Sequence, residues 1–418
     1  MTYSEAIQFL GELQIFGARF GLENIRRLAG LMGNPQDRLR FIHVAGTNGK
    51  GSTCAMLESI YRQAGLRVGL FTSPHLVSFR ERIQVNRQLI SEAEVAVLTD
   101  EISRLLKEES PDFPTTLFEV ATAMALRHFA AQDCDCVIWE TGLGGRLDAT
   151  NIVTPLASVI THISLEHEQW LGNSLAEIAA EKAGIIKPAV PVLSSVDSPE
   201  ARSVIEAVAR ERKAPLTWVA EEADTALRGG HQRRNAGLAA AVVESLNDQW
   251  PVAPGVIQKG LESVDWPGRL QLLKLADGRR VLLDGAHNAA GIQSLLRALD
   301  EYFPGERPAM ILGMLSDKDW PQMCRALAGR ASGIFAVRVN SSRAVSSEDL
   351  AASCREASPS LRTVACGSLV EAMSAAAEER LIVLAGSLYL VGEALELLQP
   401  AGAPAESEKE LNEWKTRK

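Results

Sequence analysis

A glycine-rich segment that contains a lysine and a hydroxyl residue follows a short apolar run near the N-terminus. It reads Gly46-Thr47-Asn48-Gly49-Lys50-Gly51-Ser52 and opens a stretch with helical periodicity. Glycines let backbone N–H groups approach phosphate oxygens, a lysine supplies positive charge, and a helix N-terminus adds its dipole. A hydroxyl at Ser52 can ligate Mg²⁺. The segment is predicted to bind nucleotide phosphate, although its spacing departs from G-x-x-x-x-G-K-[ST]. The alternative is a glycine-rich turn without a ligand.

A second group of candidate residues lies farther along the chain. Glu140 ends an apolar run, and a carboxylate at the carboxyl end of a parallel strand points into the crevice where such sheets bind ligands. It is a candidate Mg²⁺ ligand, the alternative being a surface carboxylate beside a loop. Taken alone, His167 is more typical of a structural hydrogen-bonding residue, and Lys182 of an exposed helix surface. Asp148 lies in a polar loop where turn chemistry is the competing explanation.

Apolar runs and amphipathic stretches alternate along the chain and would position these residues. A capping box at Ser174 and Glu177 predicts a helix toward Lys187. Residues 270–283 are predicted to form a hairpin, because Ala276-Asp277-Gly278 separates two apolar runs. The other predicted strands span 41–45, 68–72, 136–139, 157–161, 310–315, 333–339, 363–366 and 381–385.

Strands that alternate with helices indicate an α/β fold with parallel sheets covered on both faces. We predict a P-loop-type domain over residues 1–270 and a smaller Rossmann-like α/β domain over 271–418.

Composition excludes several classes of function. The 418 residues are 46% hydrophobic with a net charge of −9, which argues against a nucleic-acid phosphate surface. No apolar stretch is long enough to cross a bilayer, and the N-terminus lacks a secretion signal. Six cysteines without a CxxC pair fit a reducing compartment. These features predict a cytoplasmic protein that binds neither membranes nor nucleic acid.

The phosphate segment resembles the signature loop of the folylpolyglutamate synthase and dihydrofolate synthase family, within the Mur ligase superfamily. Mur ligases usually place Thr or Ser directly after the lysine, so Gly51 favours the folate branch. The resemblance extends over most of the chain. It includes Ser73-Pro74-His75-Leu76, the segment from Glu140 to Asn151, Glu181-Lys182-Ala183-Gly184, the segment from His231 to Asn235, Pro267-Gly268-Arg269, Asp284-Gly285-Ala286-His287-Asn288 and Gly386-Ser387.

The resemblance implies an ATP-dependent ligase that adds L-glutamate to dihydropteroate, to reduced folates, or to both, through an acyl phosphate. It implies two Mg²⁺ ions, held by Ser52, Glu140 and His167, together with catalytic roles for Lys50, His167 and Lys182. Lys182 is expected to be carbamylated, and K⁺ is a candidate cofactor. Nucleotide contacts are assigned to Gly46 through Ser52, Asn235, Arg269, Asp284 and His287. Substrate contacts are assigned to Ser73, Pro74, His75, Arg82 and Asp148.

Two positions depart from the family pattern. Glu166 precedes His167 where the family usually has Asp, and Ala289 follows Asn288 where it usually has Pro. The second change removes a rigid turn and a helix-start signal. Ser387 and Ser341-Ser342-Arg343 are the candidates for binding glutamate, and we expect a monomer.

Two other functions compete with a folate ligase. A Mur-type ligase of a peptidoglycan precursor normally has an additional N-terminal domain, for which the early phosphate segment leaves no room. A non-catalytic P-loop switch would leave Glu140, His167 and Lys182 without a purpose. A guanine-specific switch would also need Asn-Lys-x-Asp, whereas the chain offers only Ser316-Asp317-Lys318-Asp319.

Overall fold

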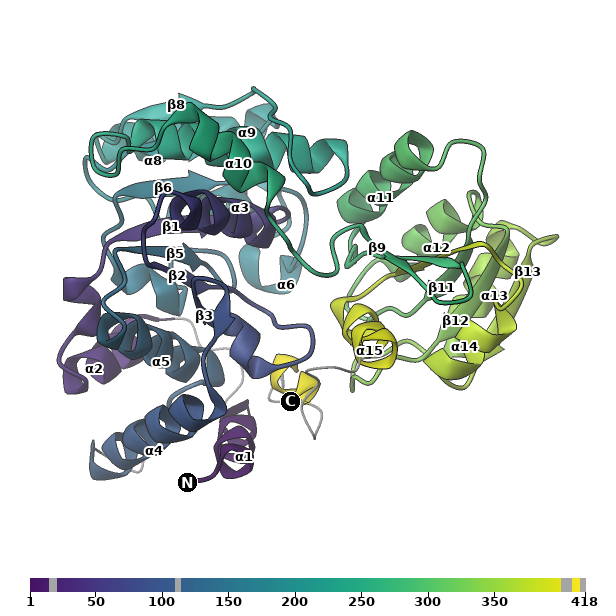
Figure 1. The fold of residues 1–418 in the computed structure, drawn as a ribbon, viewed down its shortest axis with the longest axis horizontal. Helices are drawn as coiled ribbons and strands as arrows, with labels where there is room; N and C mark the ends of the chain where they lie inside the picture. Colours follow the sequence, from purple (N-terminus) through teal and green to yellow (C-terminus); the bar gives the residue numbers. More distant parts are fainter. Residues whose placement is uncertain (15–20, 110–113, 400–407, 414–418) are drawn as a thin grey trace.

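The computed structural model describes residues 1–14, 21–109, 114–399 and 408–413. Two α/β units lie side by side, each built on one central sheet (Figure 1). Both sheets are largely parallel and have helices on both faces, so the predicted fold class is confirmed. The described end of the chain returns to lie between the two units.

The first sheet has the strand order β4-β3-β2-β5-β1-β6-β7-β8. β3 is antiparallel to both β2 and β4, and the other neighbouring strands are parallel. The central strands are fully buried because their side chains are almost wholly apolar. Parallel pairing of β1 with β5 and β6 brings the segments that follow these three strands to one edge of the sheet. The strands are β1 (Phe41–Ala45), β2 (Val68–Phe71), β3 (Ile83–Val85), β4 (Gln88–Leu89), β5 (Cys136–Glu140), β6 (Ala157–Ile160), β7 (Val192–Ser194) and β8 (Leu216–Trp218).

Helices bury both faces of the first sheet. One face packs against α3 (Lys50–Gln63), α9 (Gly230–Ser245) and α10 (Pro254–Glu262), and α7 (Leu175–Ala183) and α8 (Pro199–Glu211) pack beside its β6–β8 end. The other face packs against α1 (Tyr3–Leu13), α2 (Glu23–Leu31), α4 (Glu92–Glu109) and α5 (Leu117–Ala131). The short helices are η2 (Pro35–Arg38), η3 (Phe79–Arg82), η4 (Ala149–Ile152) and α6 (Glu168–Leu171).

The second sheet has the order β13-β12-β11-β14-β10-β9, with β9 antiparallel to β10. Its strands are β9 (Gln271–Lys274), β10 (Arg280–Leu283), β11 (Ala309–Leu312), β12 (Gly333–Val337), β13 (Arg362–Cys366) and β14 (Leu381–Ala385). One face packs on α11 (Ala289–Tyr302), α12 (Trp320–Ala328) and α13 (Ser347–Ala357), and the other on α14 (Leu369–Ala375) and α15 (Leu388–Leu398). The last described element is η5 (Lys409–Asn412).

Local sequence signals account for several element boundaries. The Ser174 capping box is confirmed, but α7 ends at Ala183 because Ile185 and Ile186 then turn into the core. The hairpin between β9 and β10 is also confirmed, and Gly278 adopts a φ of +86° in its turn. The predicted strands agree with the structure to within a few residues at each end.

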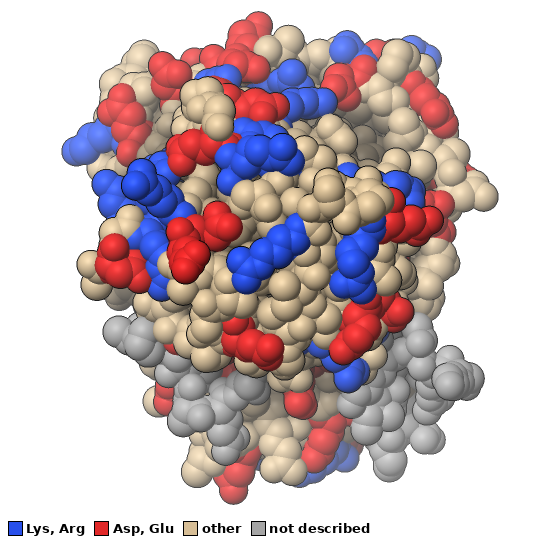
Figure 2. Space-filling model, turned by 90° about the vertical axis from the view of Figure 1, so that its right-hand side faces the viewer, with Lys and Arg blue, Asp and Glu red and all other residues tan. Residues whose placement is uncertain are grey.

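All six cysteines are free and buried. No helix in the described part of the chain is long and apolar enough to cross a bilayer. Acidic and basic side chains are intermixed over the face of the second unit that Figure 2 shows.

Candidate active site

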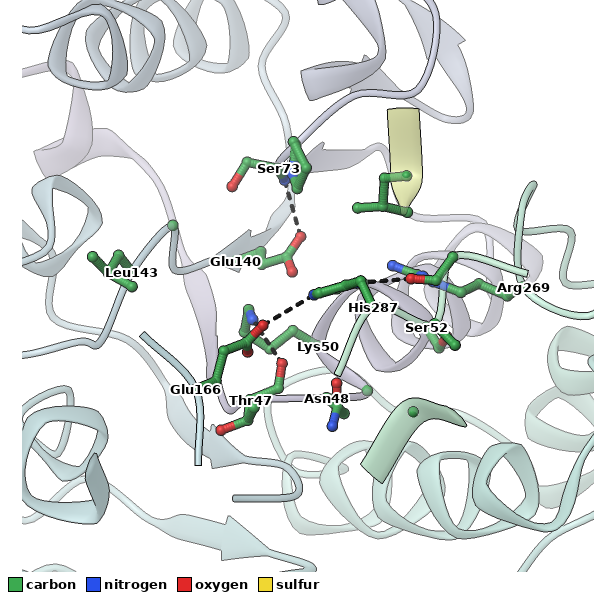
Figure 3. A pocket seen from close by; sticks show the side chains of 18 of the residues that line it. Thr47, Asn48, Lys50, Ser52, Ser73, Glu140, Leu143, Glu166, Arg269 and His287 are labelled. Atoms are coloured by element: carbon green, nitrogen blue, oxygen red, sulfur yellow. Dashed lines mark hydrogen bonds and ion pairs between the residues drawn. The ribbon is translucent and has the colours of Figure 1, made fainter. Parts of the chain in front are cut away.

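A cavity of about 850 Å³ lies between the two sheets and is lined by residues from both. Glu140, Glu166 and His287 converge beside the phosphate loop, which is residues 46–52 (Figure 3). The predicted site residues that line the cavity are Thr47, Asn48, Gly49, Lys50, Gly51, Ser52, Ser73, Pro74, Arg82, Glu140, Asp148, His167, Asn235, Arg269, Asp284 and His287. The other three lie behind the lining: Gly46 accepts from Lys50, His75 accepts from Arg82, and Lys182 donates to Gly46.

The conformation of the phosphate loop depends on two of its glycines. Gly46 has a φ of +155°, and a Cβ there would lie 1.8 Å from the Thr161 hydroxyl. Gly49 has a φ of +92°, and a Cβ would lie 2.7 Å from the Asn235 side-chain oxygen. A side chain at either glycine would therefore clash and strain the backbone. The Lys50 ammonium donates to the carbonyls of Gly46 and Thr47, at 3.0 and 3.3 Å, so it is held over the loop where phosphate would bind.

Glu140 is a buried carboxylate at the carboxyl end of β5. One of its oxygens accepts a hydrogen bond of 3.1 Å from the Ser73 backbone N–H. Burial raises the pKa of Glu140 to about 7, against the opposing positive charge of Lys50. A divalent cation would stabilise the ionised form of such a carboxylate.

The donor set fits Mg²⁺ bound together with phosphate. The described residues contain no group of three or more His, Cys, Asp or Glu side chains that could hold a metal. Mg²⁺ commonly takes only one or two protein ligands and fills its octahedron with water and substrate phosphate oxygens. Ser52 and Glu140 both line the cavity and offer a hydroxyl and a carboxylate oxygen, so they suit this mode of binding.

Lys182 is buried, whereas His167 is half-buried, with 28% of its side chain exposed. Burial and the nearby charge of Lys50 lower the pKa of Lys182 to about 7, and its ammonium donates to the Gly46 carbonyl at 2.9 Å. The prediction of an exposed helix lysine from spacing alone was wrong, because α7 packs this face against the phosphate loop. Burial lowers the pKa of His167 to about 3, so the imidazole is neutral, as a metal ligand must be.

Glu166 joins the two units. Its carboxylate accepts from His287 Nε2 at 3.0 Å and from the Lys318 ammonium at 3.3 Å, both in the second unit. Burial opposes ionisation, but the hydrogen bond from His287 and the charge of Lys318 hold the pKa of Glu166 well below its usual range. A second bridge links Asn288 Nδ2 to Asn48 Oδ1 at 3.0 Å. The longer side chain at position 166 therefore spans the seam between the sheets.

Asn288 also compensates for the missing proline at position 289. Its side chain accepts from the Gly291 N–H at 2.8 Å and caps the start of α11. The helix-start signal that proline would have supplied is thus present as an N-cap hydrogen bond.

The segment from Ser73 to Arg82 forms one wall of the cavity. Arg82 lines the wall and donates from Nε to His75 Nδ1 at 2.9 Å, so His75 is a buried support for the guanidinium. Asp148 stabilises a local turn and also faces the cavity. It caps η4 by accepting from the Thr150 N–H at 3.0 Å, and it lines the cavity.

The residues predicted to contact nucleotide come from α9 and from the segments that flank β9 and β10. Asn235, on α9, donates from Nδ2 to Gln232 at 3.1 Å and packs against Gly49. Asp284 follows β10 and accepts from the backbone N–H groups of Leu270 and Ala286, at 2.9 and 3.0 Å. Arg269 comes from the segment that joins the two sheets.

Sequence reasoning missed part of the lining. The additional residues include Gln14, Thr116, Leu117, Phe118, Glu119, Leu143, Leu147, Ala149, Lys318, Tyr389, Leu411, Asn412 and Glu413. The capping box at Thr116 and Glu119 marked the start of α5 and could have drawn attention to that corner. No local signal marks the residues near the C-terminus, because they reach the cavity only through the fold.

Comparisons with known proteins agree with this architecture. The chain matches the Mur ligase middle domain over residues 44–237 and the Mur ligase glutamate ligase domain over residues 268–388. The dihydrofolate synthase/folylpolyglutamate synthase of Bacillus subtilis is 36% identical over 380 residues, which are 84% of this chain and 88% of that protein.

Solved structures match over almost the whole chain. Folylpolyglutamate synthase from Thermotoga maritima superposes with a TM-score of 0.84 at 32% identity, covering 98% of this chain and 99% of that one. An Escherichia coli protein in complex with DHPP and ADP superposes with a TM-score of 0.85 at 30% identity, covering 96% and 98%.

Proposed function

Because this chain belongs to the folylpolyglutamate synthase and dihydrofolate synthase family of Mur ligases, we propose that it joins L-glutamate to a pteroate or folate acceptor at the expense of ATP. The acceptor is dihydropteroate, the glutamate tail of a reduced folate, or both. One observation carries the proposal: the phosphate loop, Glu140 and the loops of the second sheet line a single cavity. Such a shared site can hold ATP, an acceptor carboxylate and an amine together.

The proposed reaction activates the acceptor carboxylate as an acyl phosphate. The carboxylate oxygen attacks the γ-phosphorus of ATP and ADP leaves. The neutral glutamate amine then attacks the acyl carbon, phosphate leaves with the C–O bonding electrons, and the nitrogen releases one proton to water to give the amide. Lys50 and the loop N–H groups would stabilise charge on the transferring phosphoryl group, and closure of the two units would align the reactants.

Mg²⁺ would be held by Ser52 and Glu140, with His167 as the candidate ligand of a second ion. It would neutralise phosphate charge and polarise the transferring group. Asn235, Arg269, Asp284 and His287 are proposed to contact nucleotide, and Ser73, Pro74, Arg82 and Asp148 to contact the acceptor, with His75 supporting Arg82.

Lys182 is proposed to be carbamylated. The neutral amine would attack CO₂, forming an N–C bond and releasing one proton, so that a buried anion replaces a buried cation. A lysine whose pKa is lowered to about 7 by burial has a large neutral fraction at neutral pH, which supports this modification. A native mass spectrum of wild type and Lys182→Ala, recorded with and without bicarbonate, tests it.

We further propose that residues 1–270 bind ATP and folate, and that residues 271–418 supply nucleotide and glutamate contacts. A monomer is also proposed, which size-exclusion chromatography with light scattering would test. Six free cysteines support a reducing, cytoplasmic location. A K⁺ requirement remains a prediction, which replacing K⁺ by Na⁺ in the assay would test.

The deciding experiment supplies ATP, Mg²⁺ and radiolabelled glutamate with dihydropteroate or tetrahydrofolate in separate reactions. Label transfer to dihydropteroate alone indicates a dihydrofolate synthase, and transfer to tetrahydrofolate alone a polyglutamylating enzyme. Transfer to both indicates a bifunctional enzyme. The absence of both label transfer and acceptor-dependent ADP release would overturn the proposal, and peptidoglycan precursors would be tested next.

A further inference from the structure

Residues 408–413 lie between the two units and contact both of them (Figure 1). We call this segment the C-terminal strap. Leu411 packs in the core beneath the first sheet, and Lys409 pairs with Glu396 on α15 of the second unit. Asn412 lines the cavity. The strap therefore brings to the candidate active site residues that no sequence motif marks.

The imidazole of His75 is hydrogen-bonded through both ring nitrogens, once to the strap and once to Arg82. Nε2 lies 3.0 Å from the backbone carbonyl of Glu408, and Nδ1 accepts from Nε of Arg82 at 2.9 Å. A guanidinium can only donate, so Nδ1 must be unprotonated and Nε2 must carry the hydrogen that it donates to the carbonyl. Burial and the charge of Arg82 hold the pKa of His75 well below its usual range, so the ring is neutral. The Glu408 carbonyl thus fixes the tautomer that accepts from Arg82.

Asn412 makes a second contact between the strap and the same pair of residues. Its Oδ1 accepts from Nη2 of Arg82 at 2.7 Å, and its Nδ2 donates to the His75 backbone carbonyl at 2.9 Å. Arg82 itself is only 5% exposed. The guanidinium is therefore held at Nε through His75 and at Nη2 directly by the strap.

These contacts leave one nitrogen of Arg82 for a ligand. Within the ranges that the structure describes, Nη1 has no hydrogen-bond partner, and Arg82 lines the cavity. Burial raises the pKa of Glu140, and the positive charge of Arg82 is among those that oppose this rise, so the guanidinium faces the region of the candidate Mg²⁺ ligand. An arginine that is already held in place loses less conformational entropy when it binds an anion.

We propose that Asn412 is a positioning residue that, together with the Glu408 carbonyl, holds Arg82 in the orientation that binds the carboxylate of the acceptor. Dihydropteroate and reduced folates both have such a carboxylate, which is the group to be phosphorylated. Asn412 would act only through Arg82 and would not touch the reacting atoms. The inference rests on the proposed function, in which Arg82 contacts the acceptor, and adds that acceptor binding depends on the C-terminal strap.

The test compares Asn412→Ala with Asn412→Asp. Alanine removes both contacts, whereas aspartate keeps an oxygen for Nη2 of Arg82 and loses only the donor to the His75 carbonyl. In Asn412→Ala we expect KM for the acceptor to rise about 10-fold, the effect of losing one hydrogen bond to a charged group, while kcat changes less than about threefold. In Asn412→Asp the acceptor KM should stay within about threefold of wild type, because the charged contact remains. KM for ATP and for glutamate should be unchanged in both variants.

Stability separates positioning from a purely structural role of Asn412. Both substitutions leave the His75 carbonyl without its donor, so the melting temperature should fall in both. A structural role predicts that the acceptor KM rises in both variants as stability falls, whereas positioning predicts a rise in Asn412→Ala alone. An equal rise in the two variants, no rise in Asn412→Ala, or a rise in KM for ATP of similar size would overturn the inference.

Two control variants lie on the same strap. Glu410→Ala truncates an exposed side chain and should change neither stability nor any KM. Lys409→Met breaks the ion pair with Glu396, so it loosens the strap from the second unit and should lower the melting temperature without changing the acceptor KM. A rise in acceptor KM as large as that of Asn412→Ala would show that the strap acts as a tether between the units, and would overturn the inference.

The tautomer of His75 gives a readout that does not depend on turnover. Nitrogen NMR of protein labelled with ¹⁵N-histidine, with the signals assigned through His75→Gln, should show Nε2 protonated and Nδ1 unprotonated. The Nδ1 signal should shift in Asn412→Ala, where Arg82 is less firmly held, and stay in place in Asn412→Asp. A ring protonated at Nδ1, or an Nδ1 signal that Asn412→Ala leaves unchanged, would contradict the proposed arrangement.

The inference and the proposed function can fail separately. If wild type transferred no glutamate to either acceptor, calorimetric titration with dihydropteroate and with tetrahydrofolate, in the presence of an ATP analogue, would still test the role of the strap. Binding to wild type that weakens about 10-fold in Asn412→Ala but not in Asn412→Asp supports it. Equal affinities in wild type and Asn412→Ala, or no binding of either acceptor to wild type, overturn it.

Discussion

The phosphate loop and the seam between the two sheets reach the same cavity by different routes. The loop is seven consecutive residues whose shape depends on Gly46 and Gly49. The seam joins residues that are far apart in the sequence: 152 positions separate Glu166 from Lys318, 240 separate Asn48 from Asn288, and 330 separate Ser78 from Glu408. The residues expected to bind phosphate therefore lie together in the sequence, whereas the complete site forms only when distant segments pack together.

Replacing Lys50 by Ala should have the largest effect of the variants described, and it should lower catalytic activity without lowering stability. We expect kcat/KM to fall by about 1,000-fold, because a cation that stabilises the transferring phosphoryl group is lost. The melting temperature should stay near that of wild type, since the ammonium contacts only two loop carbonyls. Steady-state kinetics and thermal unfolding measure both quantities, and Lys213→Ala is a surface control. Near-normal turnover would remove Lys50 from the catalytic site.

The difference between the local phosphate loop and the seam explains which features could be predicted from the sequence. The loop, Glu140 at the end of β5, the Ser174 cap and the β9–β10 hairpin each have a signal within a few residues. No local sequence signal predicted that Lys182 is buried, because its spacing on α7 is equally compatible with an exposed face. The support that His75 gives to Arg82 likewise depends on a contact that no sequence pattern marks.

Glu408→Ala should weaken the packing of the C-terminal segment at the seam, and its main effect should be a lower stability. The substitution leaves the hydroxyls of Tyr3 and Ser78 and the Phe79 N–H without their acceptor. We expect the free energy of unfolding to fall by about 3 kcal/mol, as is typical when buried donors lose a charged partner. Urea denaturation measures it. Glu408→Gln, which keeps one acceptor oxygen, should lose less, and equal losses would indicate that packing rather than hydrogen bonding anchors the segment.

Glu166→Ala should weaken the bridge between the units without affecting the phosphate loop. His287 and Lys318 would lose their shared acceptor, and we expect kcat/KM to fall about 30-fold, the effect of roughly 2 kcal/mol of lost charged hydrogen bonding. Affinity for ADP, measured by calorimetry, should change much less. An equal loss in both quantities would place Glu166 in nucleotide binding rather than in assembly of the site.

His43, on strand β1 before the phosphate loop, should make the free energy of unfolding depend on pH. Burial and the nearby charge of Lys187 lower the pKa of His43 from 6.5 to about 3, and Nε2 lies 2.9 Å from the Thr150 hydroxyl. Between these two values the unfolded chain binds a proton that the folded chain excludes. Stability should therefore fall as pH falls below about 6.5, by up to about 1.4 kcal/mol per pH unit from this residue. Denaturation of His43→Gln should show a shallower slope, and an unchanged slope would assign the effect to other groups.

Ala289→Pro should give the smallest change and have the opposite sign. Position 289 is the first residue of α11, where the N–H has no intrahelical partner, and its side chain is exposed. Asn288 has φ −141° and ψ 167°, an extended conformation that a following proline accepts. Proline should therefore restrict the unfolded chain without strain and stabilise the protein by about 0.5–1 kcal/mol. Urea denaturation with an unchanged m-value would show this gain, whereas a lower stability would mean that proline disturbs the Asn288 cap and its bridge to Asn48.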